Sequence, residues 1–163
     1  MTDTRRTFLA VAGLGGVAAW LGWPRDDAQA QSHRFDVNLS EAEWRRRLTP
    51  QEFRILRQGG TEPAFTSPLN NEKRAGTFLC AGCDLPLFSS QTKFESGTGW
   101  PSFYRPLDNA VVTERDRSLG MVRTEVLCRR CGGHLGHVFD DGPPPTGKRY
   151  CMNGAALDFR PRG

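Results

Sequence analysis

Hydrophobic residues recur at helical spacing in one main stretch of the chain, between residues 40 and 60. Ser40 stands at the start of this stretch, and Glu43 follows it at the spacing of a capping box, which predicts the beginning of a short helix. Thr49-Pro50 predicts a second helix, because proline is favoured in the first helical turn, and Gly59-Gly60 ends it. We expect both helices to pack on a sheet.

Beyond Gly76 the pattern changes to short runs rich in Phe, Val, Thr and Tyr, separated by Gly, Pro, Asn and Asp. This pattern is typical of antiparallel strands. The candidate strands are Thr77–Cys80, Leu87–Ser89, Ala110–Thr113, Met121–Leu127, Arg149–Cys151 and Ala156–Phe159. Together with the length of the chain, the pattern predicts one all-β or α+β domain with small helices at its N-terminal side.

The N-terminal segment differs from the remainder. Arg5 and Arg6 precede an uncharged apolar stretch, Phe8 to Trp23, which is too short and too rich in glycine for a membrane span. The segment from Thr4 to Leu9 resembles a twin-arginine export signal, and Ala28-Gln29-Ala30 supplies the small residues that a signal peptidase requires. An uncleaved N-terminal membrane anchor is the alternative.

These observations divide the chain into three parts. We expect a twin-arginine signal peptide at residues 1–30, a flexible leader at 31–38 and the folded domain at 39–160. Export by this route makes the expected location periplasmic, with no stable membrane contact after cleavage. The net charge of +4 is spread along the chain without a run of like charges, which argues against a nucleic-acid partner.

Four of the five cysteines form two Cys-x-x-Cys pairs. Each pair directs two sulfurs to one ion from a tight turn, and two pairs complete the closed tetrahedral set that structural zinc prefers. The predicted ligands are Cys80, Cys83, Cys128 and Cys131. We expect one structural zinc ion per chain; two disulfides or a redox-active pair are the alternatives.

The fifth cysteine, Cys151, requires an explanation in an exported protein. A buried, inert thiol is one interpretation. Lys148 and Arg149 favour the other, a reactive thiolate, if they point toward the sulfur. His134 and His137 follow the second cysteine pair closely; they are either additional zinc ligands or partners of Cys151 in a Cys-plus-His catalytic group, and the four sulfurs favour the second role.

Four blocks of the chain closely resemble the methionine-R-sulfoxide reductases, over about Leu39 to Phe159. The blocks are Cys80-Ala81-Gly82-Cys83, Ser96-Gly97-Thr98-Gly99-Trp100-Pro101-Ser102-Phe103, Gly132-Gly133-His134-Leu135-Gly136-His137-Val138-Phe139 and Arg149-Tyr150-Cys151-Met152-Asn153. The resemblance implies a mainly β (α+β) domain of two antiparallel sheets with short N-terminal helices and a structural four-cysteine zinc site.

The resemblance also implies roles for individual residues. It assigns the catalytic thiolate to Cys151 and places His134, His137 and Asn153 around the sulfoxide oxygen. It packs Trp100 against the methyl group of the substrate. Without the resemblance, Trp100 would be interpreted as a core aromatic residue. The implied substrate is methionine-R-sulfoxide in proteins or peptides, and the implied activity repairs oxidised proteins.

One position departs from many members of that family. Where they carry a resolving cysteine before the Gly-Trp-Pro turn, this chain has Thr98. We therefore expect a sulfenic acid on Cys151 to be reduced by an external thiol, either a thioredoxin-like protein or a small thiol. We expect the protein to act as a monomer. A zinc-ribbon binding module and a thiol peroxidase are the rival functions.

Overall fold

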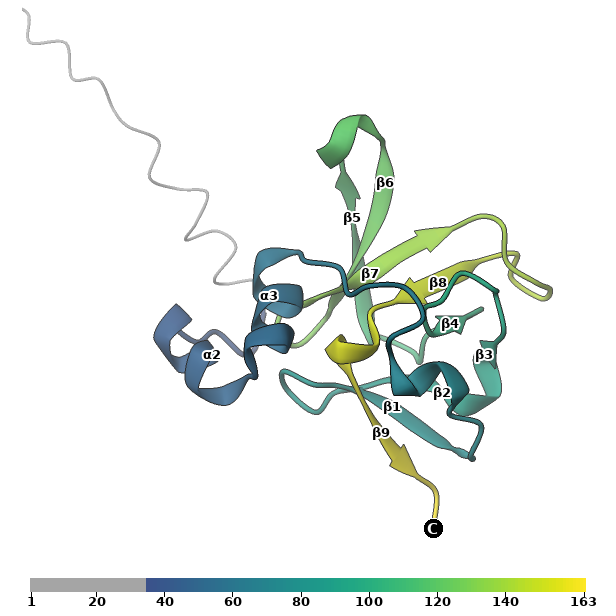
Figure 1. Cartoon of the computed structure of the whole chain (residues 1–163), viewed down its shortest axis with the longest axis horizontal. Helices are drawn as coiled ribbons and strands as arrows, with labels where there is room; N and C mark the ends of the chain where they lie inside the picture. Colours follow the sequence, from purple (N-terminus) through teal and green to yellow (C-terminus); the bar gives the residue numbers. More distant parts are fainter. Residues whose placement is uncertain (1–34) are drawn as a thin grey trace, which may run out of the picture.

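The computed structural model describes residues 35–163, which form two antiparallel β-sheets with two short α-helices beside them (Figure 1). The expected fold class is therefore confirmed. The expected signal peptide, at residues 1–30, and the first half of the expected leader, residues 31–34, lie outside the described residues. Within residues 35–163, every helix is too short or too polar to cross a membrane.

The two helices begin and end where local chemistry predicts. Helix α2 spans Glu41–Arg47, and the side chains of Ser40 and Glu43 each accept a hydrogen bond from the backbone N–H of the other, which completes the capping box. Helix α3 spans Pro50–Gln58, has a capping box of the same kind, and ends at Gly59, whose φ of 64° is left-handed. Helix α3 packs against the larger sheet, as expected.

The smaller sheet is joined to the larger one by aromatic side chains. Its strands, in spatial order, are β2 (Pro86–Ser89), β1 (Gly76–Cys80) and β9 (Leu157–Pro161). The ring of Phe103, from the larger sheet, stacks on Phe88 at 4.4 Å between centroids and meets Phe78 edge-on at 4.9 Å. All three rings are fully buried, so this cluster is the part of the core that holds the sheets together.

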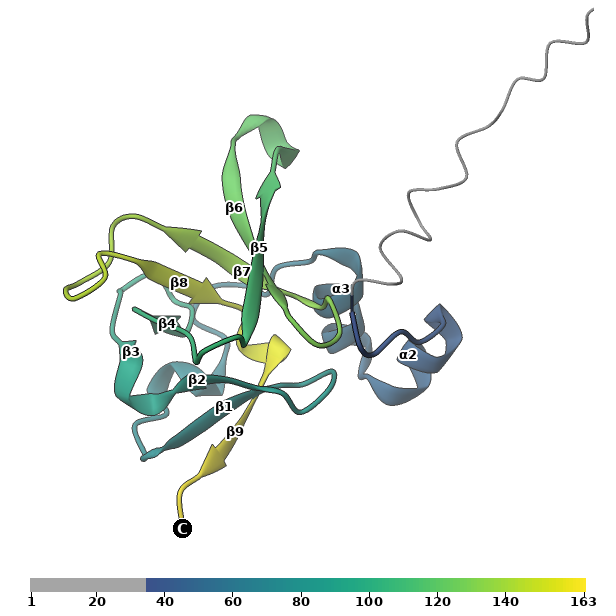
Figure 2. The ribbon, with the colours of Figure 1, turned by 180° about the vertical axis from the view of Figure 1, so that it is seen from behind.

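The larger sheet carries the candidate active site. Its six strands, in spatial order, are β3 (Lys93–Phe94), β4 (Ser102–Phe103), β8 (Arg149–Met152), β7 (His134–Phe139), β6 (Arg123–Cys128) and β5 (Val111–Asp116). The β5–β6 hairpin extends beyond the remaining strands, as the two opposite views in Figures 1 and 2 show. Short 3-10 helices lie at Pro68–Asn71, Ser90–Thr92, Ser118–Gly120 and Gly154–Ala156.

All six strands expected from the sequence are present, with ends that shift by a few residues. The largest shift is at the end of β5, which runs on to Asp116; β6 begins at Arg123, and Met121 and Val122 instead lie in the exposed turn of the hairpin. Three strands were missed: β3, β4 and β7. Glycine and histidine in β7 mask its strand pattern, and its extended shape is stabilised by neighbours on both sides, β6 and β8.

Candidate active site and candidate metal site

The register of the larger sheet places the predicted catalytic residues together. Cys151 in β8 lies directly opposite His137 in β7 and, on its other side, opposite Ser102 in β4. Side chains of directly opposed residues share one face of a sheet. A Cβ on Gly136 would lie 2.1 Å from the carbonyl oxygen of Cys151, so only glycine allows β7 to approach β8 this closely.

A β-bulge aligns the two histidines. In β6, Val126 pairs with Gly136, but the next residue, Leu127, pairs with His134, so Leu135 is an extra residue on β7. In a regular strand two residues three apart face opposite sides, and the extra residue reverses this relation. The rings of His134 and His137 consequently meet edge to face, with their centroids 5.4 Å apart.

An open pocket of about 130 Å³ lies above Cys151. Its lining residues are Thr61, Trp100, Arg123, Gly136, His137, Phe139, Cys151, Met152 and Asn153. Four predicted site residues, Cys151, His137, Asn153 and Trp100, thus share one pocket. The fifth, His134, is buried behind His137: its Nδ1 lies 2.6 Å from a carboxylate oxygen of Glu125, and its buried Nε2 has no hydrogen-bond partner within residues 35–163.

The Cys151 thiol is partly buried, and burial raises its pKa. The hydroxyl of Thr98, 3.8 Å from the sulfur, and the positive charge of Arg149 oppose this shift. Arg149 lies two residues before Cys151 on the same strand and therefore on the same face, whereas Lys148 pairs with the exposed Asp140. The resting group is thus a thiol, which becomes a thiolate when a proton moves away from it.

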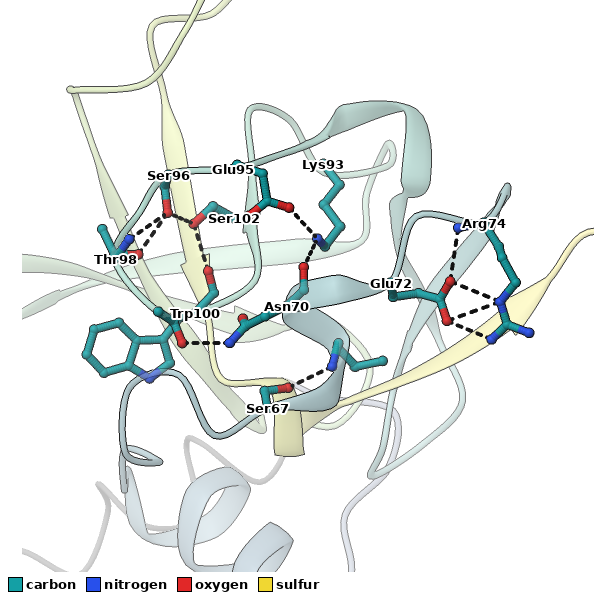
Figure 3. Close-up of polar contacts among 12 residues, drawn as sticks. Ser67, Asn70, Glu72, Arg74, Lys93, Glu95, Ser96, Thr98, Trp100 and Ser102 are labelled. Carbon is teal, nitrogen blue, oxygen red and sulfur yellow. Dashed lines mark hydrogen bonds and ion pairs between the residues drawn. The ribbon is translucent and has the colours of Figure 1, made fainter.

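A network of hydroxyl groups supports the Cys151 side of the pocket (Figure 3). Ser96 Oγ lies 2.8 Å from Thr98 Oγ1 and 2.7 Å from the buried Ser102 Oγ. The Thr98 hydroxyl continues this chain to the Cys151 sulfur. The turn that carries Thr98 is held in place by these bonds, so Thr98 keeps a fixed position beside the thiol.

Three residues at the pocket were missed by sequence reasoning, and two come from the projecting hairpin. His137 Nε2 lies 2.9 Å from Asp116 Oδ2, and the Arg123 guanidinium donates to that same oxygen at 2.7 Å. Hydrogen bonds from Ser118, and then from His137, hold the pKa of Asp116 well below its usual range. Burial lowers the pKa of His137, while the bond to Asp116 raises it. The chain offers no local motif that marks this aspartate or this arginine.

The third missed residue is Glu62, a buried acid in the loop after α3. Its backbone oxygen accepts from Trp100 Nε1 at 3.1 Å, and its backbone N–H donates to Asn153 Oδ1 at 3.0 Å. Its carboxylate accepts from the backbone N–H groups of Gly154 and Ala155. One loop residue thus holds both Trp100 and Asn153 at the pocket, and no pattern in the sequence identifies it.

The other four cysteines form a separate, buried cluster. Their sulfurs all lie within 4.8 Å of one another, with Cys80 to Cys131 at 3.7 Å and Cys83 to Cys128 at 3.5 Å. A disulfide requires about 2.05 Å, whereas sulfurs about 2.3 Å from one tetrahedral ion lie about 3.8 Å apart. The four thiols therefore fit a metal ion better than two disulfides. None of them lines the pocket above Cys151.

The two sheets, with a thiol opposite an imidazole in one pocket, fit a mainly β oxidoreductase. The SelR domain profile matches residues 48–161, which is more than half of the chain. The chain belongs to the SelR-domain family of methionine sulfoxide reductases, MsrB, as the sequence blocks predicted.

Curated relatives support this assignment over most of their length. Peptide methionine sulfoxide reductase MsrB of Leptospira interrogans is 58% identical over 127 residues, which are 77% of this chain and 97% of the relative. The protein of that name from Pseudomonas putida is 60% identical over 127 residues, covering 77% and 96%. That from Agrobacterium fabrum is 57% identical over 126 residues, covering 77% and 93%.

Proposed function

We propose that this chain reduces methionine-R-sulfoxide in peptides and proteins to methionine, with Cys151 as the nucleophile. One observation carries the assignment of roles: Cys151 lies directly opposite His137 in a pocket that Trp100 also lines. The thiol, a proton donor and an apolar ring therefore surround one small volume. Family membership supports the reaction, and this geometry supports the residues.

The reaction transfers one oxygen atom from the substrate sulfur to Cys151. The thiolate of Cys151 attacks the sulfoxide sulfur, and the oxygen gains a proton as negative charge develops on it. The hydroxyl group then passes to the Cys151 sulfur as the S–O bond of the substrate and the S–S bond formed by the attack both break, so methionine leaves and Cys151 ends as a sulfenic acid. The two electrons that reduce the sulfoxide come from the Cys151 sulfur.

His137 supplies that proton in our proposal. Because its Nε2 is bonded to Asp116, the remaining ring nitrogen, Nδ1, exchanges the proton with the substrate oxygen. His134 packs edge-on against this ring and restricts its movement. The Asn153 side chain uses one N–H for the carbonyl of Leu135, and an amide NH₂ carries a second N–H, which we assign to the sulfoxide oxygen.

Trp100 selects the enantiomer. The hydrogen bond of its indole N–H to Glu62 fixes the ring at the edge of the pocket. When the oxygen points toward His137 and the side chain leaves through the pocket opening, a chiral sulfur can present its methyl group to this ring in only one configuration. We assign the R form, in agreement with the family to which the chain belongs.

The four-cysteine cluster holds structural zinc in our proposal. Thiolates favour zinc among abundant divalent ions, and the four sulfurs leave no open position for water or substrate. The ion would stabilise the turns after β1 and β6 and take no part in the oxygen transfer. It binds through Cys80, Cys83, Cys128 and Cys131.

Regeneration of the thiol requires a reductant from outside the chain. Thr98 lies next to Cys151, where a resolving cysteine would otherwise stand, and the other four thiols lie in the buried cluster. We therefore propose that an external thiol attacks the sulfenic acid and that a second thiol equivalent releases Cys151. A thioredoxin-like protein or a small thiol meets this requirement.

We also propose that the chain is exported to the periplasm and acts there as a monomer, without stable membrane contact after cleavage. The paired Arg5 and Arg6 and the segment Ala28–Ala30 support export and cleavage. N-terminal sequencing of the exported protein tests the proposed export and cleavage. Recovery of Met1 at the N-terminus would indicate an uncleaved anchor.

Separated epimers test the reaction directly. Peptides with one R or one S methionine sulfoxide are incubated with the protein and dithiothreitol, and methionine formation is followed for each. We expect turnover of the R peptide alone. Without dithiothreitol, we expect about one product per chain and a gain of one oxygen on Cys151 by mass spectrometry. Equal reduction of both epimers, or reduction of hydrogen peroxide alone, would contradict the proposal.

The pH dependence of Asp116→Asn tests the role of His137. Burial lowers the pKa of His137 and raises that of Cys151, so the reactive pair of thiolate and imidazolium is a minor form of the free protein. kcat/KM then rises with pH through the pKa of His137 and falls through that of Cys151. Loss of the Asp116 charge lowers the pKa of His137 further, because the bond to Asp116 raises it.

We therefore expect two linked changes in this variant. The acid limb of the kcat/KM profile moves to lower pH, and the maximum falls about tenfold for each unit of that movement. The alkaline limb, which belongs to Cys151, stays in place. A uniform loss of activity at every pH, with both limbs unchanged, would show that Asp116 has only a structural role.

A further inference from the structure

A second pocket, of about 160 Å³, lies beside the first, and Trp100 lines both. Phe65, Asn70, Lys93 and Glu95 are among its other lining residues. Figure 3 shows Asn70 between the turn that carries Trp100 and the ammonium group of Lys93. No step of the sulfoxide chemistry uses these residues.

Lys93 is an unusual residue for such a place, because only 7% of its side chain is exposed. Its ammonium donates to the backbone oxygen of Asn70 at 2.7 Å and forms an ion pair with the carboxylate of Glu95, whose oxygen lies 3.8 Å away. An ammonium carries three N–H donors. Within residues 35–163, one N–H of Lys93 donates to Asn70 and the ion pair with Glu95 occupies a second, which leaves one N–H for a ligand in the pocket.

Asn70 supplies the complementary group. Its Nδ2 donates to the backbone oxygen of Gly99 at 2.9 Å, which fixes the side chain. Its Oδ1 is buried and has no hydrogen-bond donor within the described part of the chain. A buried acceptor without a donor costs about 1–3 kcal/mol. The second pocket therefore presents one unpaired donor next to an unpaired acceptor.

We propose that this second pocket binds a main-chain peptide group that flanks the oxidised methionine of the substrate. The carbonyl oxygen of that group accepts from Lys93, and its N–H donates to Asn70 Oδ1. This inference rests on the proposed function, because the methionine side chain has to occupy the first pocket. Consecutive residues lie about 3.8 Å apart along a chain, so a neighbour of that methionine lies close enough to pass around the Trp100 ring.

A main-chain group fits these walls better than an acidic side chain. A carboxylate would pair with Lys93, but it would add a second negative charge beside Glu95 and leave Asn70 Oδ1 without a donor. Phe65 lies at the rim of the pocket and is 73% exposed, so it offers apolar surface to the side chain of a substrate residue next to the oxidised methionine. Recognition of the main chain accepts substrates of any sequence, which suits an enzyme that repairs many proteins.

Two substrates that share the reacting group test the proposal. The first is a pentapeptide with a central methionine-R-sulfoxide, and the second is the R form of methyl propyl sulfoxide, which has no amide. We expect Lys93→Met to lower kcat/KM for the pentapeptide about tenfold, through KM, because a hydrogen bond to a charged group is lost. The effect on methyl propyl sulfoxide should stay within about twofold. Lys73→Met, the same change at an exposed position outside the pocket, is the matched control.

A binding measurement on the wild-type protein tests the proposal without turnover and without the Lys93→Met variant. Calorimetric titration of the wild-type protein with the methionine pentapeptide, and with analogues in which one flanking amide is replaced by an ester, should show about tenfold weaker binding for one of the esters. An equal loss for both sulfoxides, or unchanged affinity for every ester, would overturn the proposal. Absence of turnover of the R-sulfoxide pentapeptide by the wild type would instead reject the proposed function.

Discussion

Cys151→Ser is expected to reduce the rate of sulfoxide reduction by about 10⁴-fold or more, because a hydroxyl cannot form a sulfenic acid and is a far weaker nucleophile. The substitution removes no contact from the four-cysteine cluster, since Cys151 lines the pocket and lies outside that cluster. The metal content and the thermal unfolding temperature should therefore match those of the wild type. The measurement is the initial rate on the R-sulfoxide peptide, together with metal analysis of the same sample.

The outcome separates two roles for Cys151. Appreciable residual turnover in Cys151→Ser would assign the chemistry to another group and reduce Cys151 to a packing residue. Loss of metal in this variant would place its sulfur within the metal site, in conflict with the geometry. Unchanged metal with lost turnover is the combination that supports the proposed nucleophile.

Cys128→Ser is expected to show the opposite combination. Cys128 is fully buried, and its sulfur lies 3.5 Å from that of Cys83. Metal binding by such a site contributes directly to folding free energy, and its loss should cost about 5 kcal/mol or more, which is comparable with the whole stability of an ordinary domain. We expect a purified variant with little bound metal, an unfolding temperature lowered by about 15 °C or more, and partial unfolding under assay conditions.

Cys151→Ser is the matched control for this variant, because it makes the same chemical change outside the cluster. Metal content by mass spectrometry and calorimetric unfolding are the measurements. A Cys128→Ser protein that retains one equivalent of zinc and unfolds at the wild-type temperature would reject the structural metal site. Detection of iron in place of zinc would support the four-cysteine metal site but would show that the proposed ion is wrong.

Local sequence chemistry predicted the beginnings of both helices and the clustering of four cysteines. A capping box involves residues three apart, and a Cys-x-x-Cys pair lies in one turn, so each pattern carries its own structural meaning. The strand pattern of β7 is not visible in its local sequence. Gly136 weakens its strand pattern, yet it is the residue that allows β8 to approach.

The protonation state of the Cys151 thiol could not be predicted from the sequence. Lys148 and Arg149 both precede Cys151 closely in the chain, but only Arg149 affects the thiol, because it lies two residues away on the same face of β8, whereas Lys148 precedes that strand. Burial by the surrounding strands outweighs that charge and raises the pKa of the thiol. The burial of this thiol depends on residues distant in the sequence, so the residues adjacent to Cys151 do not predict it.

The sequence by itself determined which groups are available: one cysteine outside two metal-binding pairs, two nearby histidines, and a tryptophan in a glycine turn. The tertiary structure decided how these groups meet. The register of β7 and β8 sets His137 opposite Cys151, the bulge turns His134 to the same face, and the folded hairpin brings Asp116 to the His137 ring. Strand register and loop position follow from packing over the whole domain, because side-chain contacts between distant segments form only when the complete core is buried.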